Sequence, residues 1–355
     1  MSPTSYTPNA NGIPPFESLP LGTGNPKYSA WGLYGDDDEL GTLNRLTDSR
    51  VAAAARSEIK TGARYRPHPP RTHTPVRERL TKLYRVSLNW SLKAQPEPFF
   101  ARRAFHHDLY RKSPRFVNDD VWTFNSQSSS QWDGLRHFGY QDEERFYNGV
   151  TMEQVHAVGE NGERSTVNGI QDGQAWQKHG IVGRGVLVDY HSWRQTNGKP
   201  YDPFAQDSIP VADLKACLES QGTEVKFGDI LFTRTGFLAS HATKSPREIE
   251  AYRAASPQVF GGVAQSEETL RWVWDNFSAV AGDQPAFECW PRRDPRYWMH
   301  EILLGGWGMP IGELFDLEAL ADKCKQEQRW SFFITSEPCN VPGGVASPPN
   351  ILAIF

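Results

Sequence analysis

Apolar residues gather in short, nearly uninterrupted runs, which is the pattern of strands buried in the middle of a sheet. A weaker alternation of apolar and polar residues over 84–90 predicts one further, half-buried strand. The four strongest predicted strands lie at 180–190, 227–236, 278–283 and 330–336.

Amphipathic segments between these strands predict helices. The segments 211–220 and 265–277 carry apolar residues at helical spacing, and Ser266 is placed to cap the second. An Ala-rich helix is expected over 51–56 and another helix over 299–304. Strands that alternate with helices predict an α/β fold with a sheet at its centre.

The chain shows no internal repeat and no linker that would divide it into separate units. Residues 1–26 are rich in Pro, Gly, Asn, Ser and Thr, and they predict an extended arm that lies on the body or is partly disordered. Residues 27–355 are expected to form a single domain. At 355 residues the chain is long enough to bury a large core.

Charge and cysteine usage narrow the functional classes. The 38 Lys and Arg residues nearly balance 42 Asp and Glu residues, which argues against partners such as nucleic acid or an anionic membrane surface. The sequence contains no run of about 18 apolar residues, so no membrane span is predicted.

The cysteines are not arranged as Cys-x-x-Cys pairs, so we expect neither a zinc knuckle nor a thioredoxin-like site. We expect a reducing, cytoplasmic location. They are Cys217, Cys289, Cys324 and Cys339.

The segment 127–138 (QSSSQWDGLRHF) holds the densest candidate chemistry. Gln127, Gln131, Asp133 and His137 stand at i, i+4, i+6 and i+10 in a Ser-rich stretch beside Trp132. From spacing alone, an ordered loop over a pocket and a solvated loop are both open.

This segment resembles the signature His-x-Gly-Thr-His-x-Asp-x-Pro-x-His of the cyclase-like metal-dependent hydrolases, a family that includes kynurenine formamidase and isatin hydrolase. Gln127 and Gln131 fall on the two ligand histidines, Asp133 on the ligand aspartate and His137 on the last histidine. Further similarity extends over about 300 residues. It includes Trp31-Gly32, 38–44, 146–149, 180–190, 228–236, His300 with Glu313, and 340–349, which is typical of a longer, filamentous-fungal branch.

The resemblance implies a swivelling β/β/α cyclase-like fold, a small-molecule substrate and a homodimer in which the neighbouring subunit contributes to the pocket. In the family the first two histidines and the aspartate bind zinc or manganese. Imidazole binds these metals strongly, whereas a Gln carboxamide offers only a neutral, weakly donating oxygen. Two interpretations follow. Either Gln127, Gln131 and Asp133 hold Mg, Mn or Zn weakly, or the metal is lost and no cofactor is needed.

Side chains that could carry catalysis are those that exchange protons near neutral pH or accept hydrogen bonds from such groups. His137 is the expected general base, with Asp133 orienting it. His300 could act as a second acid or base, although Glu301 beside it leaves open which side chain faces the pocket. Glu313 is either its carboxylate partner or a charge before the helix that follows.

A second set of residues is expected to bind substrate, with the carboxamides as donors to a carbonyl or oxyanion. His106 and His107 follow the basic, aromatic stretch 101–105, which could form a lid or substrate-binding loop or an exposed face. The predicted substrate-binding residues are Gln127, Gln131, Trp132, Arg136, Tyr147, Asn148 and Glu288.

Three functions remain open on the sequence. The first is hydrolysis of an amide, lactam or formamide C–N bond in a carbonyl compound. The second is a metal-independent cyclase, dehydratase or isomerase of fungal secondary metabolism, and the third is a non-catalytic small-molecule binding protein. A serine α/β-hydrolase and a nicotinamide enzyme are not indicated, because Gly-x-Ser-x-Gly and Gly-x-Gly-x-x-Gly motifs in the required context are absent.

Overall fold

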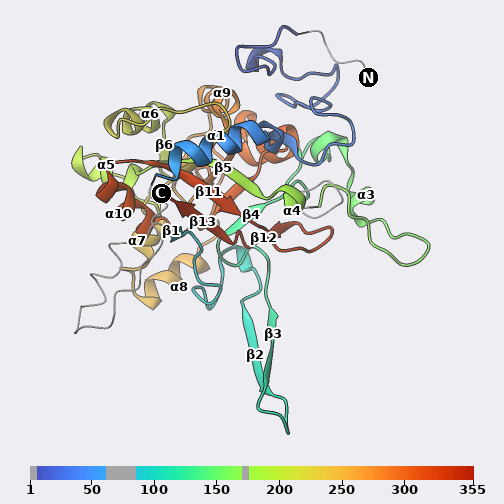
Figure 1. Cartoon of the computed structure of the whole chain (residues 1–355), viewed down its shortest axis with the longest axis vertical. Coiled ribbons are helices and arrows are strands. Elements are labelled where there is room, and N and C mark those ends of the chain that lie inside the picture. The colour runs from blue at the N-terminus through green and yellow to red at the C-terminus, as the bar shows by residue number, and fades with distance from the viewer. Residues whose placement is uncertain (1–5, 61–84, 170–175) are drawn as a thin grey trace.

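The structure, a computed structural model, describes residues 6–60, 85–169 and 176–355. Its centre is a mixed sheet in the order β1-β13-β11-β5-β7-β9-β10-β4-β12 (Figure 1). Strands β5, β7, β9 and β10 are mutually parallel, and the strands that flank this block pair antiparallel. The α/β prediction is therefore confirmed. The strands are β1 (Arg85–Ser87), β4 (Gln131–Asp133), β5 (Ile181–Val188), β7 (Asp229–Thr233), β9 (Phe277–Gly282), β10 (Ile311–Glu313), β11 (Ser331–Ser336), β12 (Ala346–Ser347) and β13 (Ile351–Ile354).

The parallel strands are buried on both faces, which explains why their sequences read as continuous apolar runs. Val186, Leu231 and Val280 face a core that also contains apolar residues of α6 (Val211–Ser220) and α9 (Glu267–Asn276). Leu187, Phe232 and Ala281 face the opposite core, beside α10 (Glu318–Glu327). The alternation along each strand thus divides the apolar residues between two layers.

The predicted helices occur where the sequence places them. Helix α1 (Asp48–Glu58) starts after Thr47, whose side chain accepts a hydrogen bond of 3.4 Å from Arg50 N. Ser266 caps α9 through a hydrogen bond of 3.1 Å from Thr269 N. Both contacts satisfy backbone donors that a helix start leaves unpaired.

The helix expected over 299–304 is a π-helix, η7 (Glu301–Gly306). Gly305 allows close packing here, because a Cβ on it would lie 3.3 Å from Gly139 Cα.

The remaining elements are short and connect the layers. The helices are α3 (Met152–His156), α4 (Trp176–His179), α5 (Tyr190–Thr196), α7 (Phe237–His241) and α8 (Pro246–Ala254); the 3-10 turns are η1 (Phe16–Ser18), η2 (Gly41–Arg45), η4 (Phe99–Ala101), η5 (Tyr147–Gly149) and η6 (Pro295–Tyr297). Strands β6 (Ser208–Ile209) and β8 (Gly262–Val263) form a small separate pair. None of the described helices combines the length and apolar character needed to cross a bilayer.

The described part of the N-terminal arm lies against the body. Phe16 is buried and stacks on Tyr28, with ring centroids 5.1 Å apart. Trp274 Nε1 donates to Pro14 O at 2.9 Å, and Trp307 Nε1 donates to Tyr28 O at 2.8 Å. The arm therefore covers α9 and η7 with aromatic contacts.

A hairpin of β2 (His106–Arg111) and β3 (Asn118–Thr123) projects away from the body (Figure 1). Sequence analysis did not predict it, because its residues show neither strict alternation nor a typical two-residue turn.

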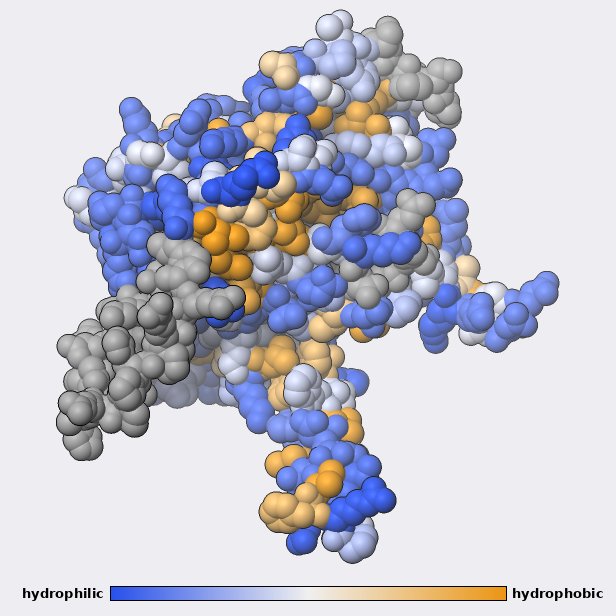
Figure 2. All heavy atoms as spheres, in the orientation of Figure 1, coloured by the Kyte–Doolittle hydropathy of each residue, from blue (hydrophilic) through white to orange (hydrophobic). Residues whose placement is uncertain are grey.

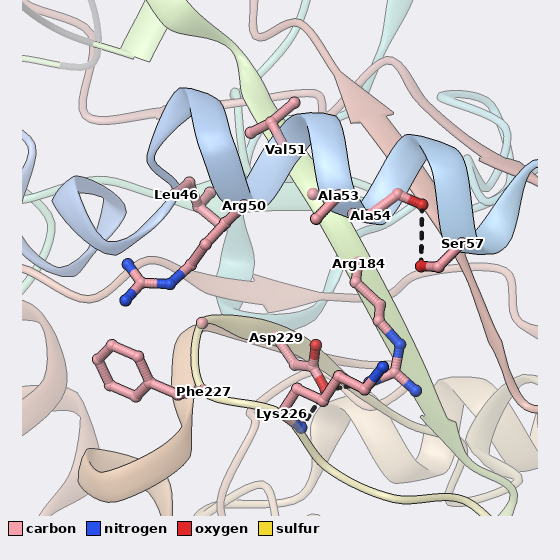
Figure 3. A pocket seen from close by; sticks show the side chains of 12 residues that line it. Leu46, Arg50, Val51, Ala53, Ala54, Ser57, Arg184, Lys226, Phe227 and Asp229 are labelled. Atoms are coloured by element: carbon pink, nitrogen blue, oxygen red, sulfur yellow. Dashed lines mark hydrogen bonds and ion pairs between the residues drawn. The ribbon is translucent and has the colours of Figure 1, made fainter. Parts of the chain in front are cut away.

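A buried ionic network anchors α1 to the sheet. Glu58 accepts hydrogen bonds from Arg184 Nε at 2.9 Å, Arg329 Nη1 at 2.7 Å and Ser331 Oγ at 2.8 Å. Arg184 also donates to Asp229 Oδ2 at 2.6 Å. Figure 3 shows Arg184 and Asp229 beside a cavity of about 210 Å³ under α1.

We expect Glu58→Gln to lower the free energy of unfolding by about 3 kcal/mol at neutral pH, because it takes the Glu58 carboxylate from Arg329 and one of two carboxylates from Arg184 in a largely buried network. Burial raises the pKa of Glu58, but Ser331, Arg184 and Arg329 outweigh it, so its pKa lies below the ordinary 4.5. Its contribution is thus complete above that value and is lost as the pH falls through the folded-state pKa.

Urea unfolding of wild type and variant should therefore give a smaller difference near pH 4 than near pH 7. Glu219→Gln, which changes an exposed side chain of α6, is the matched control and should be nearly neutral. An unchanged stability of Glu58→Gln at neutral pH would contradict the role of the network.

Candidate functional site

The candidate site lies where the carboxyl end of β10 meets the start of β4. Glu313 and Gln131 are direct partners in this antiparallel pair, so their side chains share one face of the sheet. Both are buried, and Gln131 Nε2 donates to Glu313 Oε2 at 2.8 Å. The carboxyl ends of parallel strands are the usual location of ligand sites in open α/β sheets.

His300 is held between two carboxylates. Its Nδ1 lies 3.1 Å from Glu288 Oε2, its Nε2 lies 3.2 Å from Glu313 Oε1, and its backbone N donates to Glu288 Oε1 at 3.2 Å. Burial disfavours the charged ring, yet Glu288 and Glu313 raise the pKa of His300 well above its ordinary value. His300 is thus an imidazolium with a carboxylate at each nitrogen.

The structure resolves which of the two neighbouring residues faces the site. Glu301 Oε1 accepts a hydrogen bond of 3.1 Å from Gln141 N, away from the carboxylates that hold His300. His300 is therefore the inward-facing residue.

Gln127, Asp133 and His137 form a second group beside the first. Gln127 Nε2 donates to Asp133 Oδ1 at 2.7 Å and lies 3.1 Å from His137 Nε2. His137 Nε2 lies 3.9 Å from Asp133 Oδ2, and its ring centroid lies 6.2 Å from that of His300. The residues at 127, 131, 133, 137, 288, 300 and 313, which we call the polar cluster, are therefore contiguous.

The two histidines of the polar cluster differ in protonation. Burial lowers the pKa of His137 to about 4, opposed by Asp133 and assisted by the charges of His300 and Arg102. His137 is therefore neutral at physiological pH and can accept a proton. Burial and the charge of Asp133 raise the pKa of Glu313 to about 7, against the opposing effects of His300 and Arg102.

Arg102 is a cation of the site that sequence analysis did not assign to it. Its Nη1 donates to Gln127 O at 2.9 Å, and its guanidinium lies 5.1 Å from the ring centroid of Phe100. The only sequence feature that could have indicated this role is the basic, aromatic stretch around Arg102.

Aromatic side chains line the polar cluster on one side. Phe138 and Trp290 have ring centroids 5.4 Å and 6.3 Å from that of His300. Trp298 packs on Phe138 at 4.9 Å and on Trp290 at 6.2 Å. These rings form an apolar wall next to the imidazolium.

Other predicted substrate-binding residues have structural contacts outside the polar cluster. Trp132 is fully buried, and its Nε1 donates to Ser336 Oγ at 3.0 Å. Arg136 donates to three backbone carbonyls, those of Ser165, Val167 and Gly343.

Tyr147 and Asn148 hold the loop that follows the N-terminal arm. Tyr147 OH donates to Asp38 Oδ2 at 3.0 Å, and Asn148 Nδ2 donates to Gly35 O at 3.0 Å. In this arrangement the side chains of Tyr147 and Asn148 hold the neighbouring loop in place. Membership of a sequence motif does not by itself distinguish this role from contact with substrate.

The fold and the polar cluster together define a cyclase-like α/β protein. The family model described as "Putative cyclase" matches residues 68–288, which is more than half of the chain. The chain belongs to this family. No curated protein sequence matches it.

Solved structures of the same fold include a crystal structure described as a novel cyclase, which is 30% identical with a TM-score of 0.74. That match covers 92% of this chain and 99% of the other. Isatin hydrolase A from Ralstonia solanacearum is 13% identical with a TM-score of 0.50, covering 81% of this chain and 100% of its own. An isatin hydrolase bound to the product analogue thioisatinate is 11% identical with a TM-score of 0.52, covering 76% and 92%.

The resemblance to metal-dependent hydrolases implies a metal centre, so we asked whether the residues present could bind a metal ion. Among the described residues, Asp133, His137 and His300 place one ligating atom each within 4.8 Å of one another, so the triad could hold an ion. The neighbouring chemistry does not fit a tightly bound transition metal, since both ring nitrogens of His300 face carboxylates.

The carboxamides strengthen this mismatch. Gln127 and Gln131 direct N–H groups, not lone pairs, at Asp133 and Glu313. Four oxygens of the polar cluster are buried without a hydrogen-bond partner: Asp133 Oδ2, Gln131 Oε1, Glu288 Oε2 and Glu313 Oε1. The last two lie beside the imidazolium of His300, and four oxygens still fall short of the six or more that a hard cation prefers.

We expect purified wild-type protein to contain far less than one zinc per chain, and the double variant Gln127→His/Gln131→His to gain a stoichiometric zinc site. The gain follows because two imidazoles would then join the Asp133 carboxylate. Elemental analysis and zinc titration after dialysis measure both. The control Gln141→His/Gln154→His places the same residues on exposed positions and should gain no tight site. Stoichiometric zinc or manganese in the wild type would overturn the expectation.

Proposed function

We propose that the protein is a hydrolase of the cyclase family that cleaves a carbonyl C–N bond of a small molecule, in an amide, lactam or formamide. The observation that carries the proposal is a neutral His137 beside a charged His300, at a ring separation of 6.2 Å. Adjacent groups whose environments drive their pKa values apart are the arrangement that general acid/base catalysis uses. The solved isatin hydrolases support the fold context of this reaction.

In this mechanism His137 takes a proton from a water molecule, and the water oxygen forms a bond to the carbonyl carbon. Asp133 stabilises the imidazolium that develops on His137. Gln127, which already lies against His137, donates an N–H to the oxyanion of the tetrahedral intermediate.

Collapse of the intermediate breaks the C–N bond, and the leaving nitrogen takes a proton from the Glu313–His300 pair. With a pKa of about 7, Glu313 carries a proton in a substantial fraction of molecules at neutral pH. The products are a carboxylic acid and an amine, and the proton on His137 returns to the pair through solvent. The rings of Phe138, Trp290 and Trp298 pack against the apolar part of the substrate.

A second candidate is a metal-independent cyclase, dehydratase or isomerase. It is supported by the amide groups of Gln127 and Gln131, which donate to Asp133 and Glu313. Such a reaction needs proton transfer but no attacking water. Product mass separates the two, because hydrolysis adds one water while isomerisation adds none and dehydration removes one. A protein that binds these compounds without converting them would instead be the binding protein of the third interpretation.

We expect His137→Ala to lower kcat by about 10²-fold or more while the protein remains folded, because it removes the general base. The assay is turnover of a panel of aryl formamides, lactams and cyclic imides followed by mass spectrometry. His156→Ala, at an exposed position of α3, is the control and should retain full turnover. Equal kcat for His137→Ala and wild type would remove His137 from the mechanism.

We expect Glu288→Gln to lower kcat by roughly 10-fold with little change in KM, because His300 would lose one of the carboxylates that keep it charged. Glu301→Gln is the matched control, since Glu301 adjoins His300 in sequence but contacts Gln141. A shift of the pH profile of kcat in Glu288→Gln, but not in Glu301→Gln, would show that Glu288 acts by keeping His300 charged. Identical profiles in both variants would show that Glu288 is merely structural.

A further inference from the structure

The cavity under α1 lies away from the polar cluster, at the other edge of the sheet. Gly183, Arg184 and Asp229 line it at the amino ends of the neighbouring parallel strands β5 and β7. Glu313 of the polar cluster stands at the carboxyl end of β10, which runs parallel to β9 and through it to β7. Like ends of parallel strands share one edge of a sheet, so the cavity and the polar cluster occupy opposite edges. The mechanism proposed above therefore makes no use of the cavity.

Small residues on both walls leave the space open. Ala53 and Ala54 line it from the helix. Gly183 and Gly228 line it from below, and a Cβ on Gly183 would already lie 3.0 Å from Leu46 Cδ2. At about 210 Å³ the cavity is larger than an engineered apolar cavity of roughly 150 Å³ that binds benzene. One aromatic ring with a short side chain therefore fits.

The walls are largely apolar, and the cavity opens at the surface. Leu46 and Val51 approach from the side of α1, and Phe227 from the loop before β7 (Figure 3). The lining residues Ala53 and Lys226 are exposed, so solvent reaches the opening. On the face that α1 crosses, Figure 2 shows apolar surface between charged side chains. The hollow can therefore remove the apolar body of a ligand from water.

Positive charge exceeds negative charge around the cavity. Arg50 reaches in from α1, and Lys226 stands in the loop before β7 (Figure 3). Arg184 is paired with Asp229 at 2.6 Å and with Glu58 at 2.9 Å. Burial raises the pKa of Asp229 to about 7, against the opposing effects of Arg184 and Lys226, so its negative charge is incomplete at neutral pH. These three cations thus face at most two carboxylates, and the excess charge suits an anion.

We propose that the cavity under α1 binds a small aromatic acid, which is one ring that bears a short carboxylate side chain. The ring lies between α1 and the sheet, where Phe227 packs against it. The carboxylate lies at the opening and accepts hydrogen bonds from Arg50 and Lys226, which are stronger than bonds between neutral groups. A cationic ligand would be repelled, and a neutral one would leave the excess charge uncompensated. The proposal does not rest on the proposed function, because the two sites share no residue.

Saturation-transfer NMR of the full chain with phenylacetate tests the binding. We expect a Kd of about 1 mM or lower, which is within reach of a ligand of about ten non-hydrogen atoms. The neutral 2-phenylethanol keeps the ring and lacks the carboxylate, so it should bind at least about 10-fold more weakly. Absence of phenylacetate binding, or equal affinities for the acid and the alcohol, would overturn the proposal.

A charge variant tests the role of the two cations. Arg50→Gln/Lys226→Gln should raise the Kd for phenylacetate at least about 10-fold, because it removes both charged donors. Arg56→Gln/Lys215→Gln is the matched control, since it removes two exposed cations that do not line the cavity, and it should bind as wild type does. An unchanged Kd in the first variant would contradict recognition of the carboxylate.

The position of the acid is tested by filling the cavity. Ala53→Trp places an indole at the exposed edge of the cavity and should abolish binding, whereas Ala52→Trp, which changes the neighbouring residue outside the lining, should not. A wild-type Kd in Ala53→Trp would show that phenylacetate binds elsewhere and would overturn the proposal.

Hydrogen exchange of the wild type gives the position without any variant. At ten times its Kd, phenylacetate should slow amide exchange in α1, because the bound acid holds the helix against the sheet. Slower exchange around the polar cluster with unchanged exchange in α1 would overturn the proposal.

Discussion

A buried imidazolium between two carboxylates is the interaction on which the candidate site depends. Burying Glu288 and Glu313 without a cation would cost several kcal/mol, so one of them would protonate or the site would open. His300 supplies the cation at 3.1 Å and 3.2 Å, and the amide of Gln131 donates to the remaining oxygen of Glu313. Gln127 does the same for Asp133. Amide donors and one imidazolium thus supply compensation that a divalent metal would otherwise provide.

The sheet explains why these groups can be placed so closely. Glu313 and Gln131 are 182 residues apart in sequence, yet strand pairing sets their side chains opposite each other. The π-helix after His300 begins at the same edge, and Glu288 follows β9 within a few residues. Rigid strands and a helix terminus therefore fix the charges, while His137, the general base of the proposed function, lies on a turn and is partly exposed.

The apolar pattern and the family resemblance predicted those parts of the fold and site that depend on residues close together in the sequence. The runs of β5, β7 and β9 are apolar enough to stand out, and the spacing from Gln127 to His137 showed the candidate motif. The three-residue strands β4 and β10 are too short to show a period, so their pairing could not be predicted. Neither could the contacts of Arg136 and Asn148 with distant carbonyls, because motif membership does not determine where a side chain points.

The charge balance also bears on what the site can accept and release. Asp133, Glu288 and Glu313 oppose one imidazolium and the guanidinium of Arg102, and proton uptake by Glu313 brings the sum to neutrality. A neutral carbonyl compound can enter without adding charge. In the proposed hydrolysis the product is a carboxylate, formed beside the Asp133 carboxylate, and like charges in a buried site repel strongly. The electrostatics that bind a neutral substrate therefore favour departure of an anionic product.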